Sequence, residues 1–312
     1  MNIQQLEYII AIDNERHFVK ASEKCFVTQA TLSMMIHKLE DELNVKIFDR
    51  SKQPVVPTQI GEKIITQARR IISETKAIKE IIKAEKKEIS GELKLGIIPT
   101  IAPYLLPLFI KKFNTEFPLV KITINEFVTE TLIKKLNQGE LDAAILATPL
   151  ADKNLFEQVL FYEKLMLYVS SREKKYNKAY VLPKDIELDN LLLLEERHCL
   201  RSQIINLCEL KKENNKETGF QYEAGSIETL KNLVETNNGI TIIPELATLY
   251  FSAAEKKNIR YFKQPFPVRE ISLVTHRQYA KSALIEALQK TIKSTLPKEF
   301  DNDFKKNVLE ID

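Results

Sequence analysis

The chain has 312 residues, of which 44% are hydrophobic and 29% are charged. This composition excludes a disordered chain, and the length favours two or three domains over one core. Its three cysteines are too few for a disulfide-stapled secreted scaffold. The 46 basic and 43 acidic residues leave a net charge of only +3, which by itself gives no sign of a nucleic-acid binder.

The N-terminus does not resemble a signal peptide. Glu7, Asp13, Glu15 and Arg16 stand where a signal peptide would have an apolar run. No stretch reaches the roughly 18 consecutive apolar residues of a membrane span. We therefore expect a cytoplasmic protein whose resting cysteines are reduced thiols.

The first 57 residues predict short helices followed by a brief strand-like segment. A helix over residues 18–25 places Ala21 at a close-packed position, Phe26 and Val27 form a tight turn, and Thr28 caps the next helix. That helix is expected to bury Leu32, Ile36, Leu39 and Leu43. Its opposite face carries polar residues typical of a helix-turn-helix that reads base edges, namely Gln29, Thr31, Ser33, His37 and Lys38. The alternative is a helical bundle with a solvated face.

Residues 45–57 predict a wing that lies along a phosphate backbone, with basic side chains at Lys46, Arg50 and Lys52. Between residues 45 and 70 there are six basic residues against two acidic ones, a net charge of +4. The net charge of this short segment therefore exceeds that of the whole chain, and its position favours DNA as the partner.

Residues 58–89 predict one long helix that Thr58 caps and that Ser90 and Gly91 end. A heptad seam runs along it through Ile64, Ala68, Ile71, Thr75, Ile78 and Ile82. The seam favours pairing with a second copy of the chain, and the alternative is a helix that packs on its own chain.

From Gly91 onward, predicted strands alternate with predicted helices. The strand candidates are residues 92–98, 120–126, 141–146, 164–169, 190–194, 239–243 and 271–275. The helix candidates are residues 103–116, 129–138, 226–237, 244–254 and 280–294. This alternation predicts an α/β fold with largely parallel sheets, and about 220 residues is long enough for two lobes.

Residues 6–50 and the PTQIGE motif at residues 57–62 resemble the winged helix-turn-helix of the LysR-type transcriptional regulators, and the resemblance covers nearly the whole chain. It implies a DNA-binding domain over 1–57, a linker and dimerisation helix over 58–90, and a regulatory domain over 91–312 similar to type 2 periplasmic binding proteins. Lobe I would comprise 91–163 and 269–312, and lobe II 164–268. The chain departs from the family at Ala30, commonly proline, and at Met34 and Met35, commonly polar.

Two of the three cysteines, Cys199 and Cys208, lie nine residues apart. His198 and Arg201 are expected to supply hydrogen bonds and positive charge that lower a thiol pKa, and a second thiol can resolve a sulfenic acid. Helix-compatible spacing is present at Leu200, Ile204, Leu207 and Cys208. On one continuous helix the Cα atoms of the two cysteines would be roughly 13 Å apart, whereas a disulfide needs about 4.4–6.8 Å. Disulfide formation would therefore require unwinding. The alternative is two buried thiols that act as small hydrophobic residues.

The string RHCLRSQIINLC at residues 197–208 resembles the redox segment of OxyR, the hydrogen-peroxide-sensing subfamily of LysR regulators. By this resemblance Cys199 is the peroxidatic thiol and Cys208 the resolving thiol. Thr100 in IPTIAPYLLP and Arg269 in PFPVREISLV match the thiol pocket, together with His198 and Arg201. The subfamily usually has an acidic residue where this chain has Ser202, which cannot hold a carboxylate's charge.

The resemblance implies a redox-sensing activator that binds double-stranded DNA at a pseudo-palindromic promoter site. Its further partners would be hydrogen peroxide, a cellular thiol reductant and other copies of itself, as a dimer through the linker helix and a tetramer. Two alternatives remain, a regulator with a small-molecule effector between the lobes and a thiol peroxidase. Cys25 is expected to be a core residue. The histidine spacing and seven glycines predict neither a metal site nor a cofactor, and we expect no enzyme.

Overall fold

The computed structural model describes residues 1–85, 89–173, 176, 180–186, 190–208, 224–277, 283–300 and 308–309. The chain forms two compact units, the first made of Met1–Glu88 with Asn137–Glu140 and the second of Ile89–Leu136 with Leu141–Asp312. Within the described ranges, no helix combines the length and apolar character that crossing a membrane requires.

The first unit contains the predicted helices and wing. Three short helices, α1 (Ile3–Glu15), α2 (Phe18–Lys24) and α3 (Gln29–Leu43), precede a two-stranded antiparallel ribbon of β1 (Phe48–Asp49) and β2 (Val56–Pro57). The long helix α4 (Gln59–Glu85) follows. A single apolar cluster joins residues of α1, α2, α3, the wing and the first turns of α4, and Ala21 lies fully buried within it.

The turn between α2 and α3 forms as predicted. Phe26 adopts a left-handed conformation with φ 56°, and the Thr28 hydroxyl caps α3 by accepting a hydrogen bond from the backbone N–H of Thr31 at 3.2 Å. Leu32, Ile36 and Leu39 are fully buried. The prediction for Leu43 is wrong, because this residue is 36% exposed at the last position of α3, beyond the reach of the core.

Helix α4 begins where the sequence predicts, since the Thr58 hydroxyl accepts a hydrogen bond from the backbone N–H of Gly61 at 3.0 Å. The first half of its apolar seam packs on the core of its own unit, where Ala68 is buried. Farther along, Ile78 is 61% exposed. The helix is described as far as Glu85, and residues 86–88, together with the side chain of Ile82, lie outside the description.

The second unit is built on one eight-stranded sheet with the order β4-β3-β5-β10-β6-β9-β7, and β8 pairs with β6. The strands are β3 (Gly91–Ile97), β4 (Val120–Glu126), β5 (Ala143–Thr148), β6 (Leu155–Val169), β7 (Tyr180–Val181), β8 (Ile240–Pro244), β9 (Ile259–Phe262) and β10 (Val268–His276). The prediction of a largely parallel sheet is wrong. Among the strands of the described residues, only β3, β4 and β5, and separately β7 with β9, pair in parallel, because the long strands β6 and β10 pair antiparallel with their neighbours.

The predicted helices appear as α5 (Ala102–Glu116), α6 (Thr129–Asn137), α8 (Ile227–Asn237) and α10 (Ala283–Thr295), and α7 (Cys199–Leu207) lies between the two cysteines. The interval 244–254 is not one helix, since the 3-10 helix η3 (Glu245–Tyr250) precedes the short α9 (Ala253–Lys256). Residues 190–194 form only single bridges, at Leu191 and Leu194, instead of a strand. Two more short 3-10 helices are η1 (Pro183–Asp185) and η5 (Lys298–Phe300).

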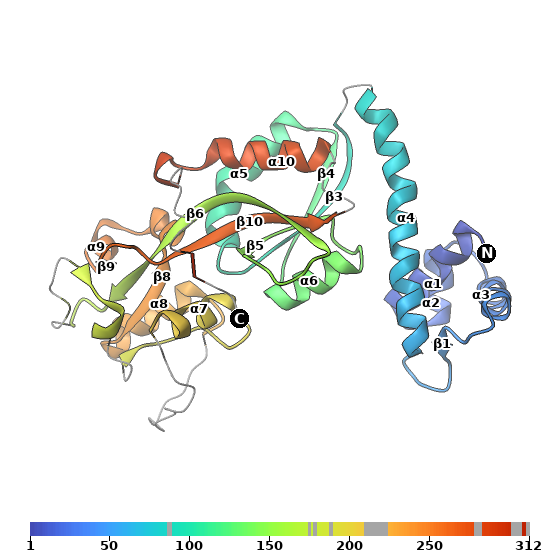
Figure 1. Ribbon diagram of the computed structural model, residues 1–312, viewed down its shortest axis with the longest axis horizontal. Helices are drawn as coiled ribbons and strands as arrows, with labels where there is room; N and C mark the ends of the chain where they lie inside the picture. The colour runs from blue at the N-terminus through green and yellow to red at the C-terminus, as the bar shows by residue number, and fades with distance from the viewer. Residues whose placement is uncertain are drawn as a thin grey trace. The chain divides into compact units, whose positions relative to one another are not determined.

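Strands β6 and β10 run side by side through the second unit (Figure 1). Helices α5 and α10 pack together beside the part of the sheet that contains β3, β4 and β5, while α7 and α8 lie near β8. One apolar cluster fills the space between sheet and helices, and Cys199, Leu200 and Ile204 of α7 belong to it. Helix α7 is therefore anchored in the core through its first two turns.

Candidate functional site

The helix-turn-helix and the wing are joined by a buried carboxylate that the sequence analysis did not single out. Glu40 of α3 is 1% exposed. Its Oε1 accepts hydrogen bonds from the backbone N–H groups of Ile47 at 2.8 Å and Phe48 at 3.3 Å. Because these donors belong to the segment that enters β1, Glu40 fixes the position of the wing relative to α3.

Arg50 of the wing is held on the protein surface by three partners. It donates hydrogen bonds to Glu40 Oε2 at 3.3 Å and to Ser33 Oγ at 3.4 Å, and its guanidinium carbon lies 5.0 Å from the centre of the Phe18 ring. The charge is therefore positioned in advance, and the remaining N–H groups stay available to a phosphate. Lys52, by contrast, is exposed.

The predicted reading residues of α3 fall into two groups. Gln29, His37 and Lys38 are exposed. Thr31 and Ser33 are half-buried and already bonded within the protein, since the Thr31 hydroxyl lies 2.9 Å from that of Thr28 and the Ser33 hydroxyl accepts from Arg50. Fewer polar side chains of α3 are therefore free to contact a partner than the sequence predicts.

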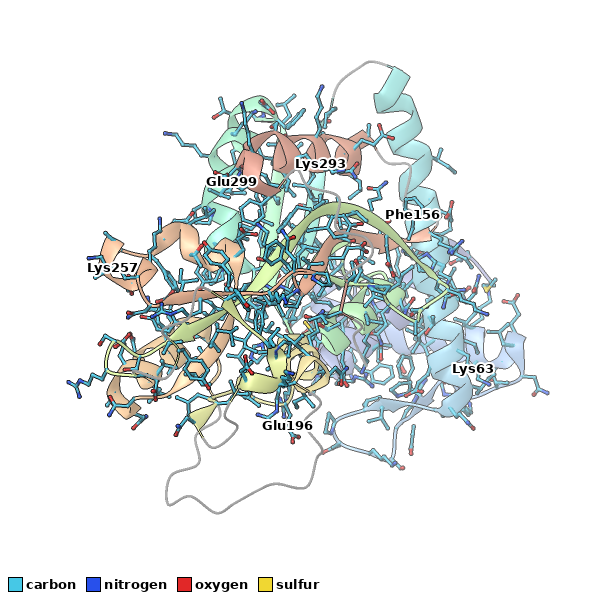
Figure 2. All side chains as sticks on the ribbon, turned by 60° about the vertical axis from the view of Figure 1, so that its left-hand side comes forward. Lys63, Phe156, Glu196, Lys257, Lys293 and Glu299 are labelled. Carbon is cyan, nitrogen blue, oxygen red and sulfur yellow. The ribbon has the colours of Figure 1, made fainter. Side chains whose placement is uncertain are left out.

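The two cysteines of the redox segment lie at opposite ends of one helix. Cys199 is the first residue of α7 and Cys208 is its C-cap, and both are free thiols. Nine helical residues correspond to roughly 13 Å between Cα atoms, about twice the span of a disulfide. In Figure 2, the label Glu196 marks the segment that leads into this helix. Helix α7 must therefore unwind before the two sulfurs can bond.

The surroundings of His198, which the sequence predicts to supply positive charge beside Cys199, favour its uncharged form. Burial lowers the pKa of His198, although Glu195 and a hydrogen bond with the Gly225 backbone oppose the shift. Its Nε2 lies 3.5 Å from Glu195 Oε1, a long contact. Arg201 uses Nη1 to donate a hydrogen bond to the Leu194 carbonyl at 2.8 Å, so its donors serve the backbone in part.

Partial burial favours the protonated form of the second thiol while α7 is intact. Burial raises the pKa of Cys208 to about 11, and the thiolate is the form that attacks sulfur. Cys199 is itself only 8% exposed. Cys25 in the first unit also has a pKa raised by burial, and it packs against the apolar cluster there, as expected for a core thiol.

Arg269 and Thr100 form one buried polar cluster. Arg269 Nη1 donates to the Thr100 hydroxyl at 3.1 Å and Nη2 to its carbonyl at 3.4 Å. Arg269 Nε donates to Glu163 Oε1 at 2.6 Å, and neither charged side chain is exposed. Since a hydroxyl can donate once and accept twice, the O–H of Thr100 remains available to a small polar molecule.

The structure brings the predicted pocket residues together in two groups. Thr100 and Arg269 form one, and His198, Cys199 and Arg201 share the start of α7. Among the described residues, no hydrogen bond or ion pair joins the two groups.

Two residues of this region were missed by the sequence analysis. Glu163 is an acid within an apolar strand, and that departure from the strand pattern was the available signal. Thr129, which follows β4 as Thr100 follows β3, buries a hydroxyl that has no hydrogen-bond partner within the described part of the chain. Both threonines lie at the carboxyl ends of parallel strands, where open α/β sheets bind ligands.

Comparisons with known proteins show the same family for both units. Residues 3–62 match the bacterial regulatory helix-turn-helix family of LysR type, and residues 86–297 match the LysR substrate binding domain. The hydrogen peroxide-inducible genes activator of Haemophilus influenzae is 37% identical over 88% of this chain and 90% of the relative. The DNA-binding transcriptional dual regulator OxyR of Escherichia coli K12 is 35% identical over 99% of this chain and 100% of the relative.

Solved structures show the same similarity. The full-length OxyR C199D protein of Pseudomonas aeruginosa superposes with a TM-score of 0.81 at 32% identity, and the match covers 95% of this chain and 99% of that one. The likeness therefore spans both units, each matched by its own part of a single relative.

Proposed function

The chain belongs to the LysR family of bacterial regulators, and we propose that it is a DNA-binding transcriptional regulator that hydrogen peroxide switches through Cys199 and Cys208. Relatives named for peroxide-inducible gene activation support the stimulus. The observation that carries the proposal is the placement of two free thiols at the two ends of α7.

The chemistry consumes one peroxide and two thiols. The Cys199 thiolate attacks one oxygen of hydrogen peroxide, the O–O bond breaks, and the second oxygen leaves as water after taking a proton. The resulting sulfenic acid is attacked by the Cys208 thiolate, which forms the S–S bond and releases a second water. A cellular thiol reductant then restores both thiols.

Burial and helix geometry determine the sequence of these two steps. While α7 is folded, Cys208 is protonated and roughly 13 Å from Cys199 along the helix. Unwinding of α7 exposes Cys208, returns its pKa toward the ordinary value and brings the sulfurs within reach. Oxidation is therefore coupled to a change of conformation, which makes the pair a switch.

Thr100, His198, Arg201 and Arg269 form the peroxide pocket in this proposal. The neutral His198 acts as a hydrogen-bonding group, and the Thr100 O–H donates to peroxide. Arg269 fixes Thr100 through two hydrogen bonds. With Ser202 in place of an acid, a hydroxyl passes on hydrogen bonds without adding negative charge.

We assign residues 1–57 to DNA binding, 58–90 to a linker and dimerisation helix, and 91–312 to regulation. Lobe I is 91–163 with 269–312 and lobe II is 164–268, so that β6 passes from one lobe to the other at Glu163. The exposed Ile78 supports pairing of two α4 helices, and a dimer predicts a pseudo-palindromic DNA site. We propose a tetramer by analogy with the family.

In the DNA-binding unit, Gln29, Thr31, Ser33, His37 and Lys38 of α3 face the major groove, and Arg50 and Lys52 of the wing contact phosphate. These roles follow from docking a recognition helix in the groove with a basic wing beside it. Because Arg50 is already held by Glu40, its phosphate contact costs little ordering of the side chain.

The proposal is tested by footprinting the full-length protein on promoter DNA, reduced and peroxide-treated, with mass mapping of cysteines under non-reducing conditions. We expect a Cys199–Cys208 bond at micromolar peroxide and an altered footprint. Absence of that bond would contradict the sensing mechanism. A bond with an unchanged footprint would contradict the proposed effect of oxidation on DNA binding. A Cys208→Ser variant that still responded to peroxide would instead favour a small-molecule effector.

We also propose that the chain is a regulator and not a thiol peroxidase. A peroxidase must complete its cycle at catalytic rates, whereas the resolving thiol here is half-buried and has a raised pKa until α7 unwinds. Steady-state peroxide consumption with a thiol reductant is therefore expected to be slow, and rapid turnover would contradict this assignment.

A further inference from the structure

The exposed face of α3 carries an apolar side chain at its centre. Met34 is 63% exposed, whereas Leu32 and Ile36, two residues before and after it, are fully buried. Two residues along an α-helix correspond to a rotation of about 200°. Met34 therefore points almost directly away from the core of its unit, in the direction in which a helix-turn-helix presents its reading residues.

Polar residues lie beside Met34 on this face, and the small apolar residue Ala30, four positions before it, is also exposed there. His37 and Lys38 follow it by three and four residues and are exposed, so they lie on the same side of the helix. Thr31 and Ser33 are bonded to Thr28 and Arg50 within the protein. The reading surface of α3 thus consists of an apolar centre with hydrogen-bonding groups around it.

We propose that Met34 is a specificity-determining residue that selects thymine by packing its side chain on the C5-methyl group in the major groove. Thymine is the only one of the four bases that presents a methyl group there. Methionine is unbranched and polarizable, so it adapts its shape to a small apolar contact. This inference rests on the proposed function, which places α3 in the major groove.

The experiment removes only the methyl group. Duplexes that the full-length protein binds are first enriched from a random-sequence pool, and each thymine of the bound site is then replaced singly by 2′-deoxyuridine. At one thymine in each half-site we expect a loss of affinity of about fourfold, the effect of one buried methyl group. Met34→Gln, similar in length, should bind the thymine and deoxyuridine duplexes equally well.

A matched control separates this contact from a general effect of exposed apolar residues. Leu119 of the second unit is 59% exposed, and Leu119→Ala should retain the wild-type preference for thymine. The inference fails, while the proposed DNA-binding function stands, if deoxyuridine has no effect at any position. The same holds if the Met34→Gln protein keeps the wild-type preference for thymine. If the pool yields no enriched duplex, the proposed DNA-binding function itself fails.

Discussion

Arg269 and Glu163 face each other on neighbouring antiparallel strands and form an ion pair at 2.6 Å with neither side chain exposed. Burial raises the pKa of Glu163, while the Arg269 guanidinium opposes that shift and favours the carboxylate. The second carboxylate oxygen accepts a hydrogen bond from the backbone N–H of Leu246 at 3.0 Å. The pair thus ties β6, β10 and η3 together and presents Arg269 to Thr100.

Glu163→Leu is expected to destabilise the protein by about 3–5 kcal/mol, because it leaves the Arg269 charge buried without a partner. Urea denaturation of the reduced protein measures this cost. The control is Glu92→Gln, which breaks the exposed pair with Lys121 and should cost only about 0–1 kcal/mol. Equal effects of the two substitutions would contradict the role given to burial.

Cys208 is expected to resist alkylation in the reduced protein. A pKa of about 11, against about 8.5 for a free thiol, lowers the thiolate fraction at pH 8 by on the order of 100-fold. Iodoacetamide labelling of a Cys199→Ser variant, followed by mass spectrometry of the Cys208 peptide, measures the rate. Unfolding in urea should restore fast labelling, and a native rate equal to that of the unfolded chain would contradict a half-buried, protonated thiol.

Helix α7 is also held by the C-terminal segment. Gln203 Nε2 donates to the Leu309 carbonyl at 3.2 Å, and the Leu309 N–H donates to the Val268 carbonyl at 2.9 Å. Gln203→Met removes the first bond at nearly constant volume, worth about 1 kcal/mol. Because α7 must unwind before the disulfide closes, closure should accelerate about fivefold.

Quenched-flow alkylation after a peroxide pulse separates this effect from the first oxidation step, whose rate we expect to stay unchanged. Leu119→Ala, at an exposed position outside this helix, is the control and should close at the wild-type rate. If Gln203→Met closes at the wild-type rate as well, α7 does not depend on the C-terminal segment.

The lowered pKa of Glu255 predicts that the protein loses stability in acid. Hydrogen bonds from Lys231 and Ser252 lower the pKa of Glu255 to about 2, whereas an unperturbed glutamate titrates near about 4.3. A carboxyl whose pKa is lower in the folded state stabilises the fold above its unfolded pKa, and this contribution disappears as the pH falls through the folded pKa.

The difference in urea midpoint between wild type and Glu255→Gln should therefore be constant from pH 7 to about 5 and shrink toward about pH 2. Taking the difference between the two proteins cancels the titration of carboxylates that do not contact Lys231, whereas Glu228 shares that lysine with Glu255. A difference that grows as the pH falls would have the wrong sign for a stabilising ion pair with Lys231.

Much of the fold was predictable because local rules decide it. The Thr28 and Thr58 caps, the buried stripe of α3 and the helix between Cys199 and Cys208 follow from spacing over a few residues. The prediction was wrong where long-range pairing decides the outcome. Residues 155–163 extend β6 and residues 190–194 form only bridges, because strand formation depends on which edge is available for pairing.

The candidate site divides in the same way. The sequence by itself determined the spacing of Cys199 and Cys208, and hence that a disulfide between them requires α7 to unwind. Only the tertiary structure decided that Glu163 pairs with Arg269, that Glu40 and Ser33 hold Arg50, and that burial lowers the pKa of His198. Helix geometry is a property of adjacent residues, whereas burial and charge pairing depend on what distant segments place beside a group.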